Sequence, residues 1–101
     1  MITHVAIFWV DKPVDKKTAD LLAGAKKLAD IPGVKHFRFG PAVPSDRGVV
    51  DDSFAVAISM DFKSRKALKK YTKHVDHVKF VQGPVKDAVR RMVAYDFGDD
   101  E

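Results

Sequence analysis

One tyrosine and two histidines in a short segment, with a third histidine near the start of the chain, are the residues with the clearest potential for chemistry. Tyr71, His74 and His77 lie close together, and His4 is the fourth residue. An imidazole with a pKa of about 6.5 accepts an acidic proton between two carbonyl groups near neutral pH. A tyrosine hydroxyl then hydrogen-bonds the oxygen on which charge develops. We therefore consider His77 and Tyr71 as a candidate catalytic pair.

The helix that carries this pair decides whether its two members can meet. On a continuous helix, Tyr71 and His77 are separated by about 600° of rotation and do not share a face. They converge only if the helix bends or restarts between them. Three interpretations stay open: a catalytic pair, a ligand pocket without catalysis, or two ordinary half-buried residues whose polar ends are satisfied.

A metal site is a weaker interpretation of the same residues. His74 and His77 are spaced so that both can face one way, but two ligands do not close a site, and the chain has no cysteine. No phosphate-binding loop, nucleophile elbow or pair of carboxylates is visible. We therefore expect neither a metal nor a cofactor.

The elements that must position these residues alternate in a recognisable order. Hydrophobic periodicity predicts strands at 2–10, 34–39, 54–62 and 92–97, a helix at 15–30, and helical segments between 64 and 81. Asp15 and Ser64 are the expected helix N-caps. The order β-α-β-β-α-β is typical of an α+β, ferredoxin-like domain: a four-stranded antiparallel sheet with its helices on one face.

A pocket between the sheet and the helices is the natural place for a ligand. His4 shares a strand face with Ile2, Ala6 and Phe8, so it becomes a polar group in an apolar wall and needs a hydrogen-bond partner. His77, Tyr71 or a backbone carbonyl would serve. We expect a small apolar or carbonyl-bearing ligand there, bound by His4, Phe8, His74, Val78 and Val81.

The other face of the predicted sheet is also apolar. Val5, Ile7 and Trp9 alternate with the residues that face the helices. Two helices cover only one face, and such a patch is too large for a monomer to leave exposed. A second copy packed sheet against sheet would cover it. We therefore predict a homodimer, a dimeric α/β barrel with these three residues in its interface.

Length and composition set the remaining limits. The 101 residues make one domain, residues 1–101, with 46% hydrophobic and 32% charged positions. The net charge of +4 arises largely from a lysine-rich run between residues 63 and 79, which we interpret as the solvated face of a helix and not as a nucleic-acid site. No signal peptide or membrane span is evident, so we expect a cytoplasmic protein without membrane partners. The long segment 40–53 is either a flap over a pocket or a dimer-contact arm.

Several of these segments together resemble the stress-responsive dimeric α/β-barrel (Dabb) family. The resemblance rests on residues 2–8, on Ile31-Pro32-Gly33-Val34, on residues 54–68 and above all on the Tyr-x-x-His-x-x-His element at residues 71–77. It covers essentially the whole chain. The family usually has proline directly after the first histidine of that element, where this chain has Val75. Proline would break the helix there, whereas valine permits it to continue.

The resemblance implies a ferredoxin-like subunit, a homodimer packed through its sheets, and a link to stress responses. Most members have no defined reaction. One plant member, olivetolic acid cyclase, closes a linear polyketide by aldol condensation with a histidine and a tyrosine. Those positions resemble His77 and Tyr71, and a further strand histidine resembles His4. A cyclase or lyase of this type is therefore the alternative to a ligand-binding protein without a defined activity.

Overall fold

The computed structural model of the chain describes residues 1–100 and consists of one sheet and one layer of helices. Its elements are, in order, β1 Ile2–Val10, α1 Val14–Ala25, a 3₁₀ segment Lys26–Asp30, β2 Lys35–Pro41, β3 Val56–Phe62, α2 Arg65–Lys73, α3 Val75–Phe80, a π-helical segment Val81–Val85, α4 Lys86–Ala88 and β4 Val89–Gly98.

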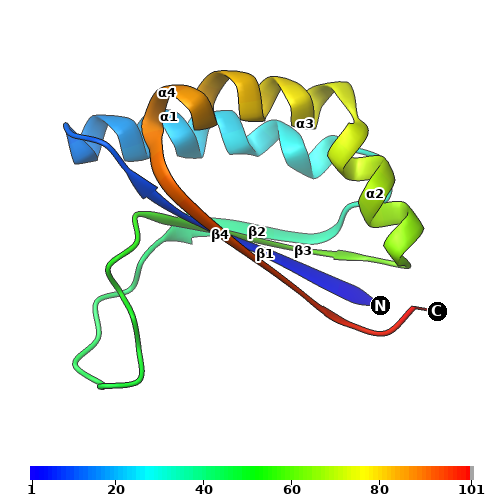
Figure 1. Cartoon of the computed structure of the whole chain (residues 1–101), viewed down its shortest axis with the longest axis horizontal. Helices are drawn as coiled ribbons and strands as arrows, with labels where there is room; N and C mark the ends of the chain where they lie inside the picture. The colour runs from blue at the N-terminus through cyan, green and yellow to red at the C-terminus, as the bar shows by residue number, and fades with distance from the viewer. Residues whose placement is uncertain (101) are drawn as a thin grey trace.

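The sheet has the strand order β2-β3-β1-β4, and every neighbouring pair is antiparallel. All the helices cover one face of it, as Figure 1 shows. The loop between β2 and β3, residues 42–55, projects on the opposite side, which we call the outer face. The predicted ferredoxin-like α+β fold is confirmed.

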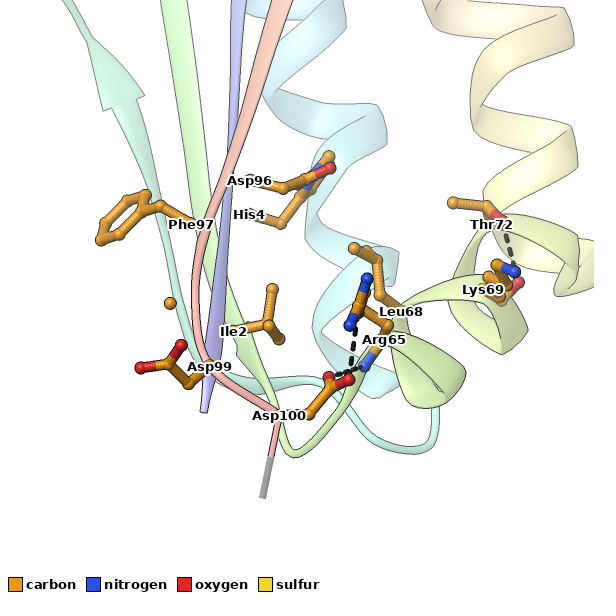
Figure 2. Close-up of a pocket in the computed structure, with 11 residues that line it drawn as sticks. Ile2, His4, Arg65, Leu68, Lys69, Thr72, Asp96, Phe97, Asp99 and Asp100 are labelled. Carbon is orange, nitrogen blue, oxygen red and sulfur yellow. Dashed lines mark hydrogen bonds and ion pairs between the residues drawn. The ribbon is translucent and has the colours of Figure 1, made fainter.

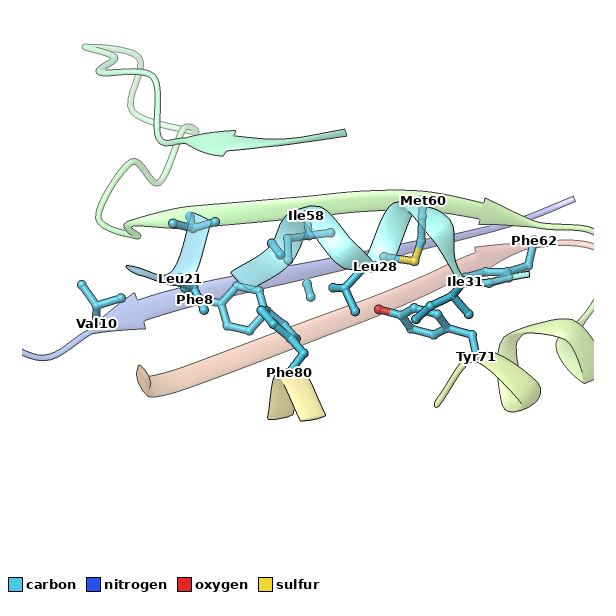
Figure 3. Close-up of a cluster of buried hydrophobic side chains, with 13 residues drawn as sticks. Phe8, Val10, Leu21, Leu28, Ile31, Ile58, Met60, Phe62, Tyr71 and Phe80 are labelled. Atoms are coloured by element: carbon cyan, nitrogen blue, oxygen red, sulfur yellow. The ribbon is translucent and has the colours of Figure 1, made fainter. Parts of the chain in front are cut away.

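The core lies between the sheet and the helices (Figure 3). Alternate residues of β3 point into it, and Val56, Ile58, Met60 and Phe62 are each at most 1% exposed. Helix α1 contributes Leu21 and Ala25, and the 3₁₀ segment contributes Leu28. Phe8 of β1 packs edge-to-face on Phe80, with ring centroids 6.2 Å apart. Burial of this apolar surface is the main driving force that holds the helices on the sheet.

Helix ends differ in part from the sequence-based prediction. Ser64 caps α2 as expected, because its hydroxyl accepts a hydrogen bond from the amide of Ala67 at 3.2 Å. Asp15 is not an N-cap. Helix α1 begins at Val14 after Pro13, whose side chain cannot cap, and Asp15 lies in the first turn, where its charge favours the helix dipole. The α-helix ends at Ala25, and the last turn tightens to 3₁₀, as helix ends often do.

Phe54 and Trp9 also differ from the prediction. Phe54 precedes β3 and does not join its core-facing row. Its ring packs edge-to-face on Trp9 of the outer face, with centroids 6.5 Å apart. The Trp9 indole also donates a hydrogen bond to the Ser53 hydroxyl at 3.1 Å and lies under the guanidinium of Arg91. Trp9 is therefore only 8% exposed within one chain, because its own loop covers it. We had expected it to be open to solvent.

The lysine-rich segment is exposed along its length, as predicted for a solvated helix face; the exposed residues are Lys63, Arg65, Lys66, Lys69, Lys70, Lys73 and Lys79. Within residues 1–100, no helix combines the length and apolar character that spanning a membrane requires.

Candidate functional site

The helix that carries the histidines stops and restarts at His74. This residue has extended backbone angles, φ −64° and ψ 143°, and ends α2. It also begins α3, because its Nδ1 accepts a hydrogen bond from the amide of Asp76 at 3.1 Å. The expectation that Val75 lets the helix continue is wrong: the side-chain cap at His74 produces the break without proline.

The restart brings Tyr71 and His77 together. Their ring centroids are 4.7 Å apart, and the Tyr71 ring lies 6.0 Å from His4 on the sheet. We call His4, Tyr71 and His77 the ring cluster. Tyr71 is its centre, is 2% exposed and also packs on Phe62 at 5.1 Å. In Figure 3 its hydroxyl points into the layer between sheet and helices, toward Leu28. Burial raises the pKa of the Tyr71 hydroxyl well above its usual range, so the group is a neutral donor.

His77 is held in one tautomer by the backbone. Its Nδ1 lies 2.9 Å from the carbonyl oxygen of Thr72, and a carbonyl only accepts hydrogen bonds. Nδ1 therefore carries the proton, and Nε2 of the neutral ring carries the free lone pair. Burial lowers the pKa of His77, and the nearby His4 lowers it further, while the bond to Thr72 acts in the opposite direction. The ring is thus an uncharged base near neutral pH.

His4 has a partner that sequence reasoning missed. Its Nδ1 lies 2.5 Å from Oδ1 of Asp96 on the neighbouring strand β4. Since an ionised carboxylate only accepts, Nδ1 of His4 is the donor, and its Nε2 is directed by this bond. The expected partners were Tyr71, His77 or a carbonyl. The strand register pairs His4 with Asp96, and the alternation of β4 already placed Asp96 on the same face as Ala94. A predicted pairing of the first and last strands would have found it.

A pocket of about 590 Å³ opens beside the ring cluster (Figure 2). His4 and Asp96 line it from the sheet, Leu68 and Thr72 from α2, and Ile2 and Phe97 add apolar surface. At its rim the Asp100 carboxylate binds the Nε of Arg65 at 3.0 Å. Tyr71 and His77 do not line this pocket. They lie behind two residues that do, because His4 packs on Tyr71 and the Thr72 carbonyl holds His77.

The other residues predicted to bind a ligand do not line it either. Phe8 is 2% exposed and belongs to the core. His74 acts as the cap of α3. Val78 and Val81 are 36% and 42% exposed, because the helix after the restart turns Phe80 toward the core in their place.

Metal binding finds no cluster to support it. Across residues 1–100, no three or more His, Cys, Asp or Glu side chains are grouped so that they could hold an ion. The side chains of His74 and Asp76 come within 3.9 Å of each other, but His74 is engaged in capping.

Comparison with known proteins settles the family. The model of the family described as the stress responsive A/B barrel domain (Dabb) matches residues 2–99. The chain belongs to this family. A comparison with curated proteins gives no significant match.

Solved structures agree with this assignment. A Dabb family protein with a ferredoxin-like fold from Mesorhizobium loti is 25% identical, with a TM-score of 0.75 over 97% of this chain and 95% of that one. A dimeric ferredoxin-like protein of unknown function from Thermobifida fusca is 24% identical, with a TM-score of 0.76 over 97% of this chain and 90% of that one. A hydroxynitrile lyase from Passiflora edulis has the same fold at 17% identity, with a TM-score of 0.80 over 99% of this chain and 94% of that one. Several neighbours of this Dabb chain are thus described as dimers, and one as an enzyme.

Proposed function

We propose that this Dabb protein is a homodimer in which each subunit binds a small molecule with apolar and carbonyl groups in the pocket beside the ring cluster. The observation that carries this proposal is the convergence of His4, Tyr71 and His77 from two different elements at the wall of that pocket. Core residues at these positions would pack more simply as aliphatic side chains, since every buried polar group needs a partner.

The pocket's chemistry matches such a ligand. Ile2, Leu68 and Phe97 offer apolar contact, while His4 offers an imidazole whose orientation Asp96 fixes. A pocket of several hundred Å³ with a few placed polar groups is the usual form of a small-molecule site. A carbonyl oxygen of the ligand accepts a hydrogen bond from a protonated His4, and its apolar part rests on Leu68 and Phe97.

Titration with a β-ketoacyl thioester of N-acetylcysteamine tests the binding. We expect saturable binding to the wild type, seen by calorimetry, and at least tenfold weaker binding to His4→Ala. The matched control is His36→Ala, because His36 lies on the outer face with a side chain that is 70% exposed. Equal affinity of wild type and His4→Ala refutes the site.

Dimerisation is tested separately. Native mass spectrometry of the purified protein should give twice the subunit mass and would also detect a retained ligand. The dimeric neighbours support this expectation. A species of one subunit mass at micromolar concentration contradicts it.

A second candidate function is proton transfer, as in a polyketide cyclase or a lyase. The tautomer of His77 favours it, because Nδ1 is engaged with Thr72 and Nε2 is left as a base. In this step Nε2 takes a proton from the carbon between two carbonyl groups, and the electron pair of that C–H bond moves to a carbonyl oxygen, forming an enolate. The Tyr71 hydroxyl donates a hydrogen bond to that oxygen. The enolate then attacks a second carbonyl of the same molecule.

Exchange of the ligand's α-hydrogen in D₂O isolates the first step of this reaction. Proton NMR of the β-ketoacyl thioester should show faster exchange with the wild type than with His77→Gln or Tyr71→Phe. A hydroxynitrile serves as a second substrate class, because one structure of the same fold is a hydroxynitrile lyase. Equal exchange rates for all three proteins remove the catalytic interpretation and leave the binding proposal intact.

A further inference from the structure

The loop between β2 and β3 belongs to the outer face of the sheet and not to the ligand pocket. Its Ser53 and Phe54 both contact Trp9 of that face. The ring cluster lies on the opposite face, among the helices. The loop is therefore no flap over that cluster, which removes one of the two roles predicted for it.

The loop and the sheet enclose a groove on the outer face. Its volume is about 420 Å³, and it lies over the β2–β3 side of the sheet. Val5, Ala57 and Ser59 form its floor, and Val43 and Val50 of the loop form its wall. We call this the outer groove. Its apolar lining is open, since Val43 is 78% exposed and Val50 is 39% exposed.

Two large aromatic side chains stand on the other side of the same face. Tyr95 and Phe97 of the edge strand β4 are 60% and 61% exposed. They pair in the register with Val5 and Thr3 of β1, so they point to the outer face. The face therefore carries a groove at one edge and projecting rings at the other.

The direction of a two-fold axis decides whether these features meet. A closed dimer of identical subunits uses the same patch on both copies. If the axis runs parallel to the strands, β4 of one copy lies over the β2–β3 side of the other, at the same level along the strands. If the axis runs across the strands, β4 lies over β4, and each groove faces the other groove.

The register places the ring and the groove at one level. Tyr95 pairs with Val5, Val5 pairs with Ser59, and Ser59 pairs with Arg38. Ser59 and Arg38 both line the outer groove. With the axis parallel to the strands, Tyr95 of a second copy therefore arrives over the groove. Arg38 is exposed there and can donate to the tyrosine hydroxyl or lie over its ring.

We propose that the dimer's two-fold axis runs parallel to the strands and that Tyr95 of each copy inserts into the outer groove of the other, with loop 42–55 as the arm that closes over it. The inference rests on the homodimer of the proposed function and adds its geometry. The exposed aromatics and the open groove are thereby buried twice per dimer, and buried aromatic rings dominate interface energetics.

Thiol cross-linking tests this arrangement directly, because the chain has no cysteine of its own. Tyr95→Cys and Ser59→Cys subunits are co-expressed with different tags, purified as the mixed dimer and treated with a short bismaleimide. We expect an efficient 59–95 cross-link between subunits and little 95–95 cross-link in dimers of Tyr95→Cys alone. Lys66→Cys, on the helix α2 face, is the control and should not link.

A dominant 95–95 cross-link overturns the arrangement while the homodimer itself survives. Absence of both cross-links, with light scattering at one subunit mass for the wild type, overturns the arrangement and the homodimer together. Neither result affects the ligand titrations, which report on the opposite face. A second measurement covers any loss of affinity caused by the cysteines. Tyr95→Asp and Ala57→Arg should each raise the dimer dissociation constant at least tenfold, whereas Lys66→Asp should leave it unchanged; an unchanged constant for both outer-face variants also refutes the proposal.

Discussion

The ring of Tyr71 lies 4.7 Å from the ring of His77, although a continuous helix would place the two on different faces. His74 makes the contact possible by ending α2 and capping α3 with its own side chain. The break also leaves the Thr72 carbonyl free to accept from Nδ1 of His77. One capping residue therefore sets both the position and the tautomer of the candidate base.

Val75→Pro should be neutral or stabilising. Val75 is the first residue of α3, where proline's fixed φ fits and its missing N–H costs nothing. The preceding His74 already has the extended angles that a residue before proline prefers. We expect the free energy of unfolding in urea to rise by about 0.4–1 kcal/mol or stay unchanged.

Val78→Pro is the matched control for that substitution. Its amide donates to the His74 carbonyl at 3.0 Å, so proline removes a helix bond and should cost about 3 kcal/mol. A loss of comparable size for Val75→Pro would mean that α3 does not begin at this residue.

Acidification should destabilise the protein through His77. Its pKa is lowered in the folded state from 6.5, so the unfolded chain binds the proton more readily as the pH falls. Stability is complete above about pH 6.5 and decreases as the pH drops through the lowered value. Urea denaturation of the wild type and of His77→Gln between about pH 5 and pH 7.5 measures this. A stability difference between the two that is independent of pH contradicts the shift.

Tyr71 should contribute to stability through its ring and to function through its hydroxyl. Tyr71→Ala removes a side chain that contacts Phe62, His4 and His77 and should cost about 3–5 kcal/mol. Tyr71→Phe keeps that packing and should change the unfolding free energy by less than about 1.5 kcal/mol. If Tyr71→Phe unfolds as easily as Tyr71→Ala, the hydroxyl has a structural role that the ring contacts do not explain.

Asp96 should fix the tautomer of His4. In the wild type, long-range ¹H–¹⁵N spectra should show His4 with a protonated Nδ1, because the carboxylate accepts from it. Asp96→Leu removes the acceptor, so we expect the ring to become a mixture of tautomers and ligand binding to weaken. Asp99→Leu, which alters another pocket-lining carboxylate, is the control. A His4 spectrum that Asp96→Leu leaves unchanged would remove Asp96 from the site.

Much of the fold follows from local patterns in the sequence. The alternation in β1 and β3 and the Ser64 cap are each encoded within a few residues, and all three are present in the structure. The ring cluster was also within reach, because His4 and Tyr71 both fall on positions that face the layer between sheet and helices.

The misplaced features depend on contacts between distant segments. Asp96 meets His4 through strand pairing across the whole length of the chain, which no local spacing reports. Trp9 is covered by residues 44 or more positions away, so its exposure could not be judged from β1 alone. His74 departs from helical geometry because its own side chain caps the next helix, although neither proline nor glycine marks the site.

Histidine NMR tests the binding of a carbonyl ligand at the ring cluster most directly. Protein labelled with ¹⁵N in its imidazole rings is titrated with the β-ketoacyl thioester. We predict that the ring signals of His4 and then His77 shift saturably, while those of His36 on the outer face stay in place. Signals of His4 and His77 that move no more than those of His36 would contradict the proposed site.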